Sequence, residues 1–133
     1  MIWQLTQNKD WATIEKQFSW VADMKNVNQH KVHHAEGNVA THTQMVIDEL
    51  LNNSIYQNLD EQAKEILWAA ALLHDVEKRS TSEDLADGII NANGHARRGE
   101  YTARTVLYKD VPTPFSIREQ ITSLVRFHGL PLW

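Results

Sequence analysis

The sequence predicts an all-α protein, folded as a compact bundle of five to seven helices. Apolar residues recur every three or four positions in several segments, which is the spacing of one face of a helix. Glycine and proline are scarce, with five Gly and three Pro among 133 residues, which favours helices over a sandwich or barrel. We expect one domain spanning residues 1–133, because a chain of this length can bury a real core.

The first two predicted helices both begin at a capping residue. Asp10 precedes the first helix, and Asn38 stands where the second starts, after a polar stretch at 25–37. His42 falls on the apolar face of the second helix, so its imidazole is expected to point into the bundle. The apolar faces are Trp11, Ile14, Phe18 and Val21 in the first helix, and Val39, Thr43, Val46, Ile47 and Leu50 in the second.

The third predicted helix begins after Asp60 and ends in the sequence HDVEKR at 74–79. Segment 81–91 is expected to form a short helix and a loop. The fourth helix opens at Gly94 and carries His95 on its inner side. The inner residues of these helices are Ala63, Ile66, Leu67, Ala70 and Leu73 in the third, and His95, Gly99, Thr102 and Val106 in the fourth.

The fifth predicted helix begins at Pro114 or Ser116, after a proline-containing linker. Ser116 and Glu119 have the spacing of a capping box, in which two side chains cap each other's backbone N–H. Its apolar face is Ile117, Ile121, Leu124 and Val125, extended by His128. Gly129 and Pro131 are expected to end it. Either the apolar Trp133 that follows docks on the body of the domain, or the chain is the N-terminal part of a longer protein with a C-terminal partner domain.

Composition excludes several classes of protein. There is no Cys, so disulfides and thiolate zinc sites are ruled out. The net charge of -4 gives no overall attraction to nucleic acid, and no apolar run is long enough to span a bilayer. The sequence contains no P-loop, no GxGxxG fingerprint and no nucleophile elbow. We expect a cytoplasmic protein with no membrane partner.

Four inward-facing histidines on four different helices are the main functional signal. A buried imidazole needs a polar partner, and for any single histidine that partner is most often a backbone carbonyl or water. When the four helices pack together, however, the imidazoles can converge on one point. The four are His42, His74, His95 and His128.

Asp75 strengthens this prediction, because a carboxylate at the inner end of an apolar helix needs a cation or hydrogen-bond donors. Adjacent side chains on a helix diverge by about 100°, so His74 and Asp75 cannot point along one radius. Either one ion lies between them near the helix surface, or Asp75 bridges two ions. Imidazole and carboxylate ligands favour Fe, Mn, Co, Ni or Zn, as one or two divalent ions.

These residues stand in motifs that resemble the HD superfamily of metal-dependent phosphohydrolases. The motifs are HAEGNVATHT at 34–43, AALLHDVEK at 70–78, GHARRG at 94–99 and RFH at 126–128. The first is similar to the start of the HD domain in bacterial CCA-adding tRNA nucleotidyltransferases, and the N-terminal region is similar to HD domains joined to RNA-repair kinases. An HD dipeptide alone is weak evidence, whereas the ordered set, covering residues 32–130, is specific.

The resemblance implies an HD-type helical bundle, bound divalent metal and hydrolysis of phosphate esters. It assigns His42, His74 and Asp75 as metal ligands, with His95 and His128 completing a second site. The sequence departs from the family pattern twice. Ala35 replaces the usual Pro, and no Asp after Asp110 supplies the usual late ligand. Either His128 takes that place, or the missing Asp lies beyond residue 133.

Several cations and polar residues could handle the phosphate. Lys78 follows His74 by four residues, so it projects near the metal, although a lysine at a helix C-terminus is also simply favourable there. Arg97 and Arg98 lie in the first turn of a predicted helix, where the dipole disfavours cations unless an anion binds. His34 and Glu36 precede the first ligand on a polar loop and could contact substrate. Solvent exposure is the alternative for each.

We therefore expect a phosphomonoesterase or 2′,3′-cyclic phosphodiesterase acting on a nucleotide or an RNA terminus. Asp75 would orient or deprotonate the attacking water, and Lys78 with Arg97 or Arg98 would hold the phosphate. The alternative is a catalytically weak HD-fold regulatory or RNA-binding module, which the missing late Asp favours. A plain helical interaction domain would require four inward histidines and Asp75 to coincide by chance.

Overall fold

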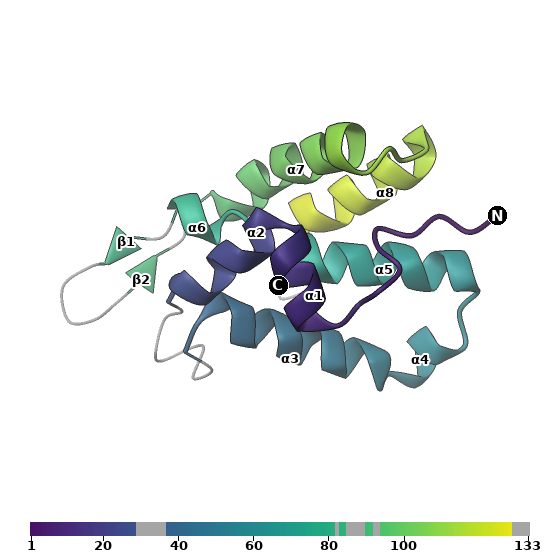
Figure 1. Cartoon of the computed structure of the whole chain (residues 1–133), viewed down its shortest axis with the longest axis horizontal. Coiled ribbons are helices and arrows are strands. Elements are labelled where there is room, and N and C mark those ends of the chain that lie inside the picture. Colours follow the sequence, from purple (N-terminus) through teal and green to yellow (C-terminus); the bar gives the residue numbers. More distant parts are fainter. Residues whose placement is uncertain (29–36, 82, 85–89, 92–93, 129–133) are drawn as a thin grey trace.

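The computed structural model describes residues 1–28, 37–81, 83–84, 90–91 and 94–128. Four longer helices form the body: α3 (Val39–Leu51), α5 (Glu61–Leu73), α7 (His95–Thr105) and α8 (Phe115–Arg126). Helix α7 packs on α8, α8 packs on α5, and α5 packs on α3, so that α3 and α7 lie on opposite sides of the bundle (Figure 1). The predicted all-α bundle of five to seven helices is confirmed.

The N-terminal helical region is divided, where the sequence predicted one helix. Helix α1 (Trp11–Gln17) ends at Phe18, whose backbone is extended, and α2 (Ser19–Ala22) and the 3-10 turn η1 (Asp23–Asn26) follow. The break places the Phe18 ring against the Trp20 ring, with centroids 4.8 Å apart, and both side chains are buried. Burial of two aromatic rings outweighs helical periodicity here.

The predicted helix starts are confirmed by their caps. A carboxylate or amide oxygen accepts a backbone N–H at the start of three helices: Asp10 from Thr13 in α1, Asn38 from Thr41 in α3, and Asp60 from Ala63 in α5. Such caps satisfy N–H groups that have no partner within the helix. The short helix α4 (Ser54–Gln57), capped by Asn53, was not predicted.

The chain after α5 differs from the sequence prediction. Helix α5 ends at Leu73, residues 74–77 form a turn, and α6 (Lys78–Thr81) follows. Of the helix and loop expected over 81–91, the helix ends at Thr81 with α6, and β1 (Glu83–Asp84) pairs antiparallel with β2 (Ile90–Asn91). The rest of that segment falls outside the described residues. The turn takes Asp75 out of α5, the helix on which the side chains of Asp75 and His74 would diverge.

Helix α7 continues into a π-helical segment, η3 (Val106–Asp110), and α8 then starts after Pro114. The predicted capping box of Ser116 and Glu119 is wrong, because Pro114 occupies the cap position and the Glu119 carboxylate instead accepts hydrogen bonds from Arg104. Gly99 allows α7 and α8 to approach closely. A Cβ at Gly99 would lie 3.1 Å from Cγ1 of Val125.

The core lies where α1, α3, α5, α7 and α8 face one another. Its largest fully buried side chains include Ile14, Met24, Leu72, Leu73, Leu107 and Ile121. Within the part of the chain that the structure describes, no helix combines the length and apolar character needed to cross a membrane.

Candidate metal centre

Four imidazoles surround the carboxylate of Asp75. One carboxylate oxygen, Oδ2, lies 2.9 Å from His74 Nε2 and 3.5 Å from His42 Nε2. The other, Oδ1, lies 3.2 Å from His95 Nε2 and 3.4 Å from His128 Nε2. The two oxygens thus define two groups of three ligands that share Asp75. We call these the first half-site (His42, His74, Asp75) and the second half-site (His95, His128, Asp75).

Each ligand lies at or near the end of a helix. His42 is in the first turn of α3, and His74 caps the C-terminus of α5. His95 is the first residue of α7, and His128 follows the last turn of α8. Asp75 lies in the turn after α5 and is only 2% exposed. The bundle therefore brings four helix ends to one buried carboxylate, which helical periodicity alone does not predict.

Backbone carbonyls fix the orientation of two imidazoles. Nδ1 of His74 lies 2.6 Å from the carbonyl of Ala71, and Nδ1 of His128 lies 2.7 Å from the carbonyl of Val125. Since a carbonyl only accepts, each Nδ1 carries the proton and each Nε2 points toward Asp75. Metal-binding histidines are held in this way, with Nδ1–H donated to the backbone and the Nε2 lone pair left for the metal.

The spacing of the donor atoms suits a bound metal ion. For metal–ligand distances of about 2.0–2.1 Å, neighbouring ligand atoms in octahedral or tetrahedral geometry lie roughly 2.9–3.4 Å apart. Three of the four Nε2–Oδ distances, 2.9, 3.2 and 3.4 Å, fall within that range, and the fourth, 3.5 Å from His42, lies just above it. Neutral Nε2 lone pairs that face a carboxylate repel it unless a proton or a cation lies between them. These five residues could therefore hold a metal ion.

The Asp75 carboxylate depends on cationic or hydrogen-bond-donating partners. Burial raises the pKa of Asp75, but the His74 charge and the hydrogen bonds from His128, His74 and His95 outweigh it and hold that pKa well below its usual range. Burial lowers the pKa of His74, yet the charge and hydrogen bond of Asp75 leave it raised overall. Asp75 thus remains an anion inside the protein, and an anion is what a divalent ion requires there.

Lys78 and a cavity lie beside the cluster. The Nζ of Lys78 is 3.5 Å from Asp75 Oδ2, and the side chain is almost fully buried. The cavity has a volume of about 1170 Å³ and opens next to the imidazoles, between α3, α5 and α8. All five candidate ligands and Lys78 line it. A small molecule in this cavity could therefore reach both half-sites and Lys78.

Glu77 connects the turn of residues 74–77 to its surroundings, a role that sequence reasoning missed. Its carboxylate accepts hydrogen bonds from the hydroxyls of Thr102 in α7 and Ser80, and from the guanidinium of Arg79. Arg79 also donates to Asp23 of η1 at 2.8 Å. Burial raises the pKa of Glu77, but these hydrogen bonds outweigh it and lower the pKa overall. The only sequence signal was a charged residue two positions after Asp75.

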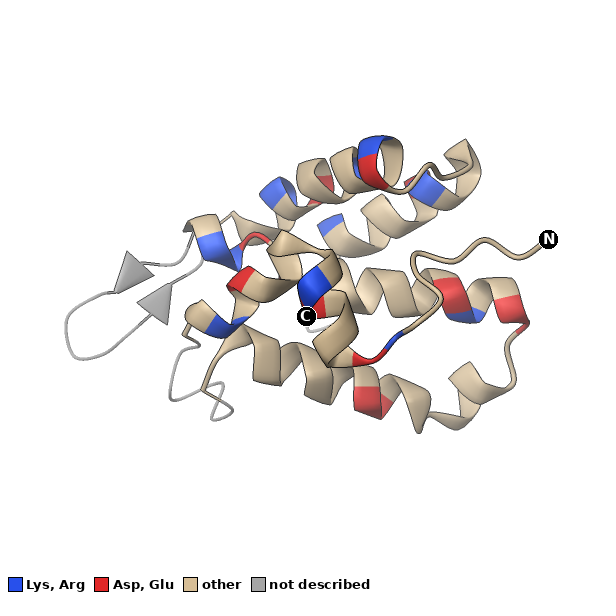
Figure 2. Cartoon of the chain, in the orientation of Figure 1, with Lys and Arg blue, Asp and Glu red and all other residues tan. Residues whose placement is uncertain are grey.

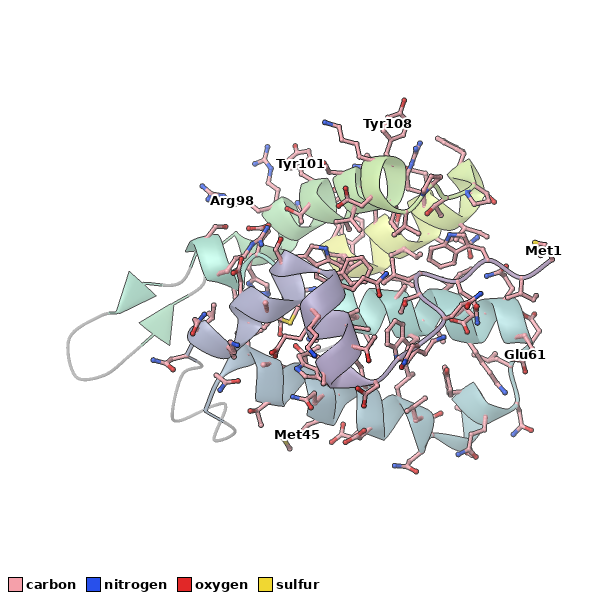
Figure 3. All side chains as sticks on the ribbon, viewed as in Figure 1. Met1, Met45, Glu61, Arg98, Tyr101 and Tyr108 are labelled. Atoms are coloured by element: carbon pink, nitrogen blue, oxygen red, sulfur yellow. The ribbon has the colours of Figure 1, made fainter. Side chains whose placement is uncertain are left out.

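The other predicted phosphate-binding residues are not brought to the cluster. Arg97 and Arg98 are exposed in the first turn of α7, and neither is among the described residues that line the cavity. Figure 3 shows Arg98 projecting outward from α7, on the same side as Tyr101. His34 and Glu36 fall outside the residues that the structure describes. His128, in contrast, lies in the second half-site, which could hold a metal ion.

The fold and the cluster together define an all-α protein with a buried His/Asp site that could bind metal. Comparisons with protein-family models, with curated proteins and with solved structures find no match to this chain. Any functional assignment therefore depends on the sequence motifs and on the geometry described above.

Proposed function

We propose that this chain is an HD-type metal-dependent phosphohydrolase that cleaves phosphate monoesters or 2′,3′-cyclic phosphodiesters of a nucleotide or an RNA terminus. The observation that carries the proposal is the shared carboxylate. Each oxygen of Asp75 faces two imidazoles, so one side chain could bridge two ions of Fe, Mn, Co, Ni or Zn. Of the two arrangements that the sequence left open, this favours the bridging one.

The residues around the cluster suit the chemistry of ester hydrolysis. A divalent ion, when bound, polarises a phosphoryl oxygen and makes water a better nucleophile near neutral pH. Asp75, as an anion, would orient or deprotonate the reacting water by accepting a hydrogen bond from it. The four imidazoles hold Asp75 in place, two of them anchored to backbone carbonyls.

Lys78 is positioned to hold the phosphate. Its ammonium group lines the cavity at the first half-site and can donate hydrogen bonds to a phosphoryl oxygen while its charge offsets that of the ester. Arg97 and Arg98 are exposed and outside the cavity lining, so Lys78 is the stronger candidate among the three predicted cations.

Hydrolysis assays with loaded protein test this proposal. The purified chain is incubated with Mn, Ni, Co or Zn and assayed on bis-p-nitrophenyl phosphate and 2′,3′-cAMP. We expect turnover that is lost in His74→Ala and Asp75→Ala, while Asp48→Ala, an exposed carboxylate on α3, retains it. Protein that binds metal but hydrolyses neither ester would contradict the proposed phosphohydrolase activity.

A regulatory or RNA-binding module without catalysis is the second candidate. The specific observation in its favour is that both described half-sites share a single carboxylate, that of Asp75. Each ion would therefore have few anionic ligands. This candidate predicts bound metal without turnover in the same assay.

A further inference from the structure

An apolar groove leads away from the candidate metal centre along α5 and α8. The cavity beside the cluster shares Leu67, Ser116, Gln120 and Leu124 with a second cavity of about 600 Å³, which extends to Asp60 at the start of α5. We call the two together the α5/α8 groove. It follows α5 over at least eight residues, which corresponds to about 12 Å of helix.

The walls of the groove are largely uncharged. Short side chains on α5, Ala70 and Ala71, leave space beside the imidazoles. On α8 the wall residues recur at helical spacing, and two of them are large, apolar and accessible: Leu124 is 41% exposed and Phe127 is 51% exposed. The remaining wall residues include Val46 and Leu67, which are apolar, and Ser116, Gln120 and Ser123, which are polar but neutral. The groove thus offers apolar surface that a ligand could cover.

Positive charge is confined to the end of the groove that holds the metal centre. Among the described residues that line either cavity, Lys78, in the cavity beside the metal centre, is the only lysine or arginine. Further along, the charged wall residues are Asp60 and Glu119, and the Glu119 carboxylate is paired with Arg104 and Arg118. The charged residues of α5 itself lie in its first turns, and the rest of that helix is neutral up to the turn at Asp75 (Figure 2). Beyond Lys78, a second phosphate in the groove would therefore meet no lysine or arginine among the described lining residues.

We propose that the α5/α8 groove binds the alcohol part of the ester, and that this part is uncharged and largely apolar, with a single phosphate at the metal centre. This inference rests on the proposed function and narrows its substrate. An ester of nucleotide size or smaller, with one phosphate, matches the distribution of charge. A nucleic acid strand, which carries one negative charge per nucleotide, does not match it.

Binding of non-hydrolysable phosphonates tests the proposal without relying on catalysis. Ethylphosphonate and hexylphosphonate carry the same head group and differ by four methylenes. Each buried methylene is worth about fourfold in affinity, so burial of only two of the four gives about 16-fold tighter binding. We expect hexylphosphonate to bind the metal-loaded chain at least about tenfold more tightly than ethylphosphonate in calorimetric titrations.

A variant in the groove and a matched control show where the hexyl chain binds. Leu124→Ser removes apolar surface from the groove and should reduce the hexyl-to-ethyl preference severalfold. Leu51→Ser changes a leucine of similar exposure, 44%, on α3 outside both cavities, and should leave the preference unchanged.

Three results would overturn the proposal, and they separate it from the proposed function. Equal affinity for both phosphonates contradicts binding of the alkyl chain in the groove but is compatible with the proposed phosphohydrolase activity. Tighter binding of a 3′-phosphorylated trinucleotide than of hexylphosphonate means that the occupant is a nucleic acid strand. Failure of every phosphonate and of inorganic phosphate to bind the metal-loaded chain contradicts both the groove and the proposed function.

Discussion

Replacing Glu77 by Gln tests whether the turn of residues 74–77 is held in place by its hydrogen bonds. The Glu77 side chain is nearly buried, at 6% exposure, and its two oxygens accept from Thr102, Ser80 and Arg79. An amide of the same shape has one accepting oxygen, so at least one donor loses its partner. Hydrogen bonds to a charged group contribute about 1.5–3 kcal/mol each.

We therefore expect Glu77→Gln to lower the free energy of unfolding by about 1.5–3 kcal/mol, measured by urea denaturation of the metal-free chain. Glu100→Gln on α7 is the matched control, because Glu100 forms partly exposed ion pairs with Arg104 and Arg126. Such pairs contribute about 0–1 kcal/mol. Equal destabilisation by the two substitutions would refute this reasoning.

The destabilisation by Glu77→Gln has a defined pH dependence. The folded-state pKa of Glu77 is lowered, so its ionised form contributes stability that is fully present above the unfolded pKa of about 4.3. That contribution is lost as the pH falls through the lowered folded-state value. The stability difference between the wild type and Glu77→Gln should therefore shrink in acid. A difference that grows below the unfolded pKa would contradict the hydrogen-bonding account.

Three further perturbations have outcomes that the structure predicts. A chelator added to metal-loaded protein should lower the free energy of unfolding by about 2.7 kcal/mol when the free metal concentration is initially about 100 times the dissociation constant. A melting temperature that does not change would show that no ion stabilises the fold. Gly99→Val should cost about 1–3 kcal/mol in denaturant unfolding, because a Cβ at this position would lie 3.1 Å from Cγ1 of Val125 and a branched side chain would extend further into α8. An unchanged midpoint would mean that the helices separate freely. Asn38→Ala should cost about 1 kcal/mol by removing the cap on Thr41 N–H, and a loss below a few tenths would mean that water replaces the cap.

Local signals predicted the main helices well. Asp10, Asn38 and Asp60 cap helices in the structure, as their positions before apolar stripes indicated. The predictions failed where tertiary packing outweighs local preference. Phe18 interrupts a periodic stripe because its ring packs on Trp20, and Glu119 pairs with Arg104 on the neighbouring helix instead of capping its own.

The ligand set was predictable in part because imidazoles on apolar faces are costly without a partner. That argument selected His42, His74, His95 and His128, but it could not supply distances between helices. The position of Asp75 in a turn, where both of its oxygens are accessible to imidazoles, depends on where α5 ends. The α5/α8 groove was also not predicted, because the space beside Ala70 and Ala71 arises only when α3 and α8 pack around them.

The number of divalent ions bound per chain tests the central claim most directly. Protein loaded with Mn, Co or Zn, separated from free metal and analysed by mass spectrometry, should contain one or two ions per chain. Asp75→Asn should lose them, because the carboxylate shared by both half-sites is gone. A folded wild-type chain that retains no ion, or an Asp75→Asn variant that retains as many as the wild type, would contradict the assignment of this cluster as a metal centre.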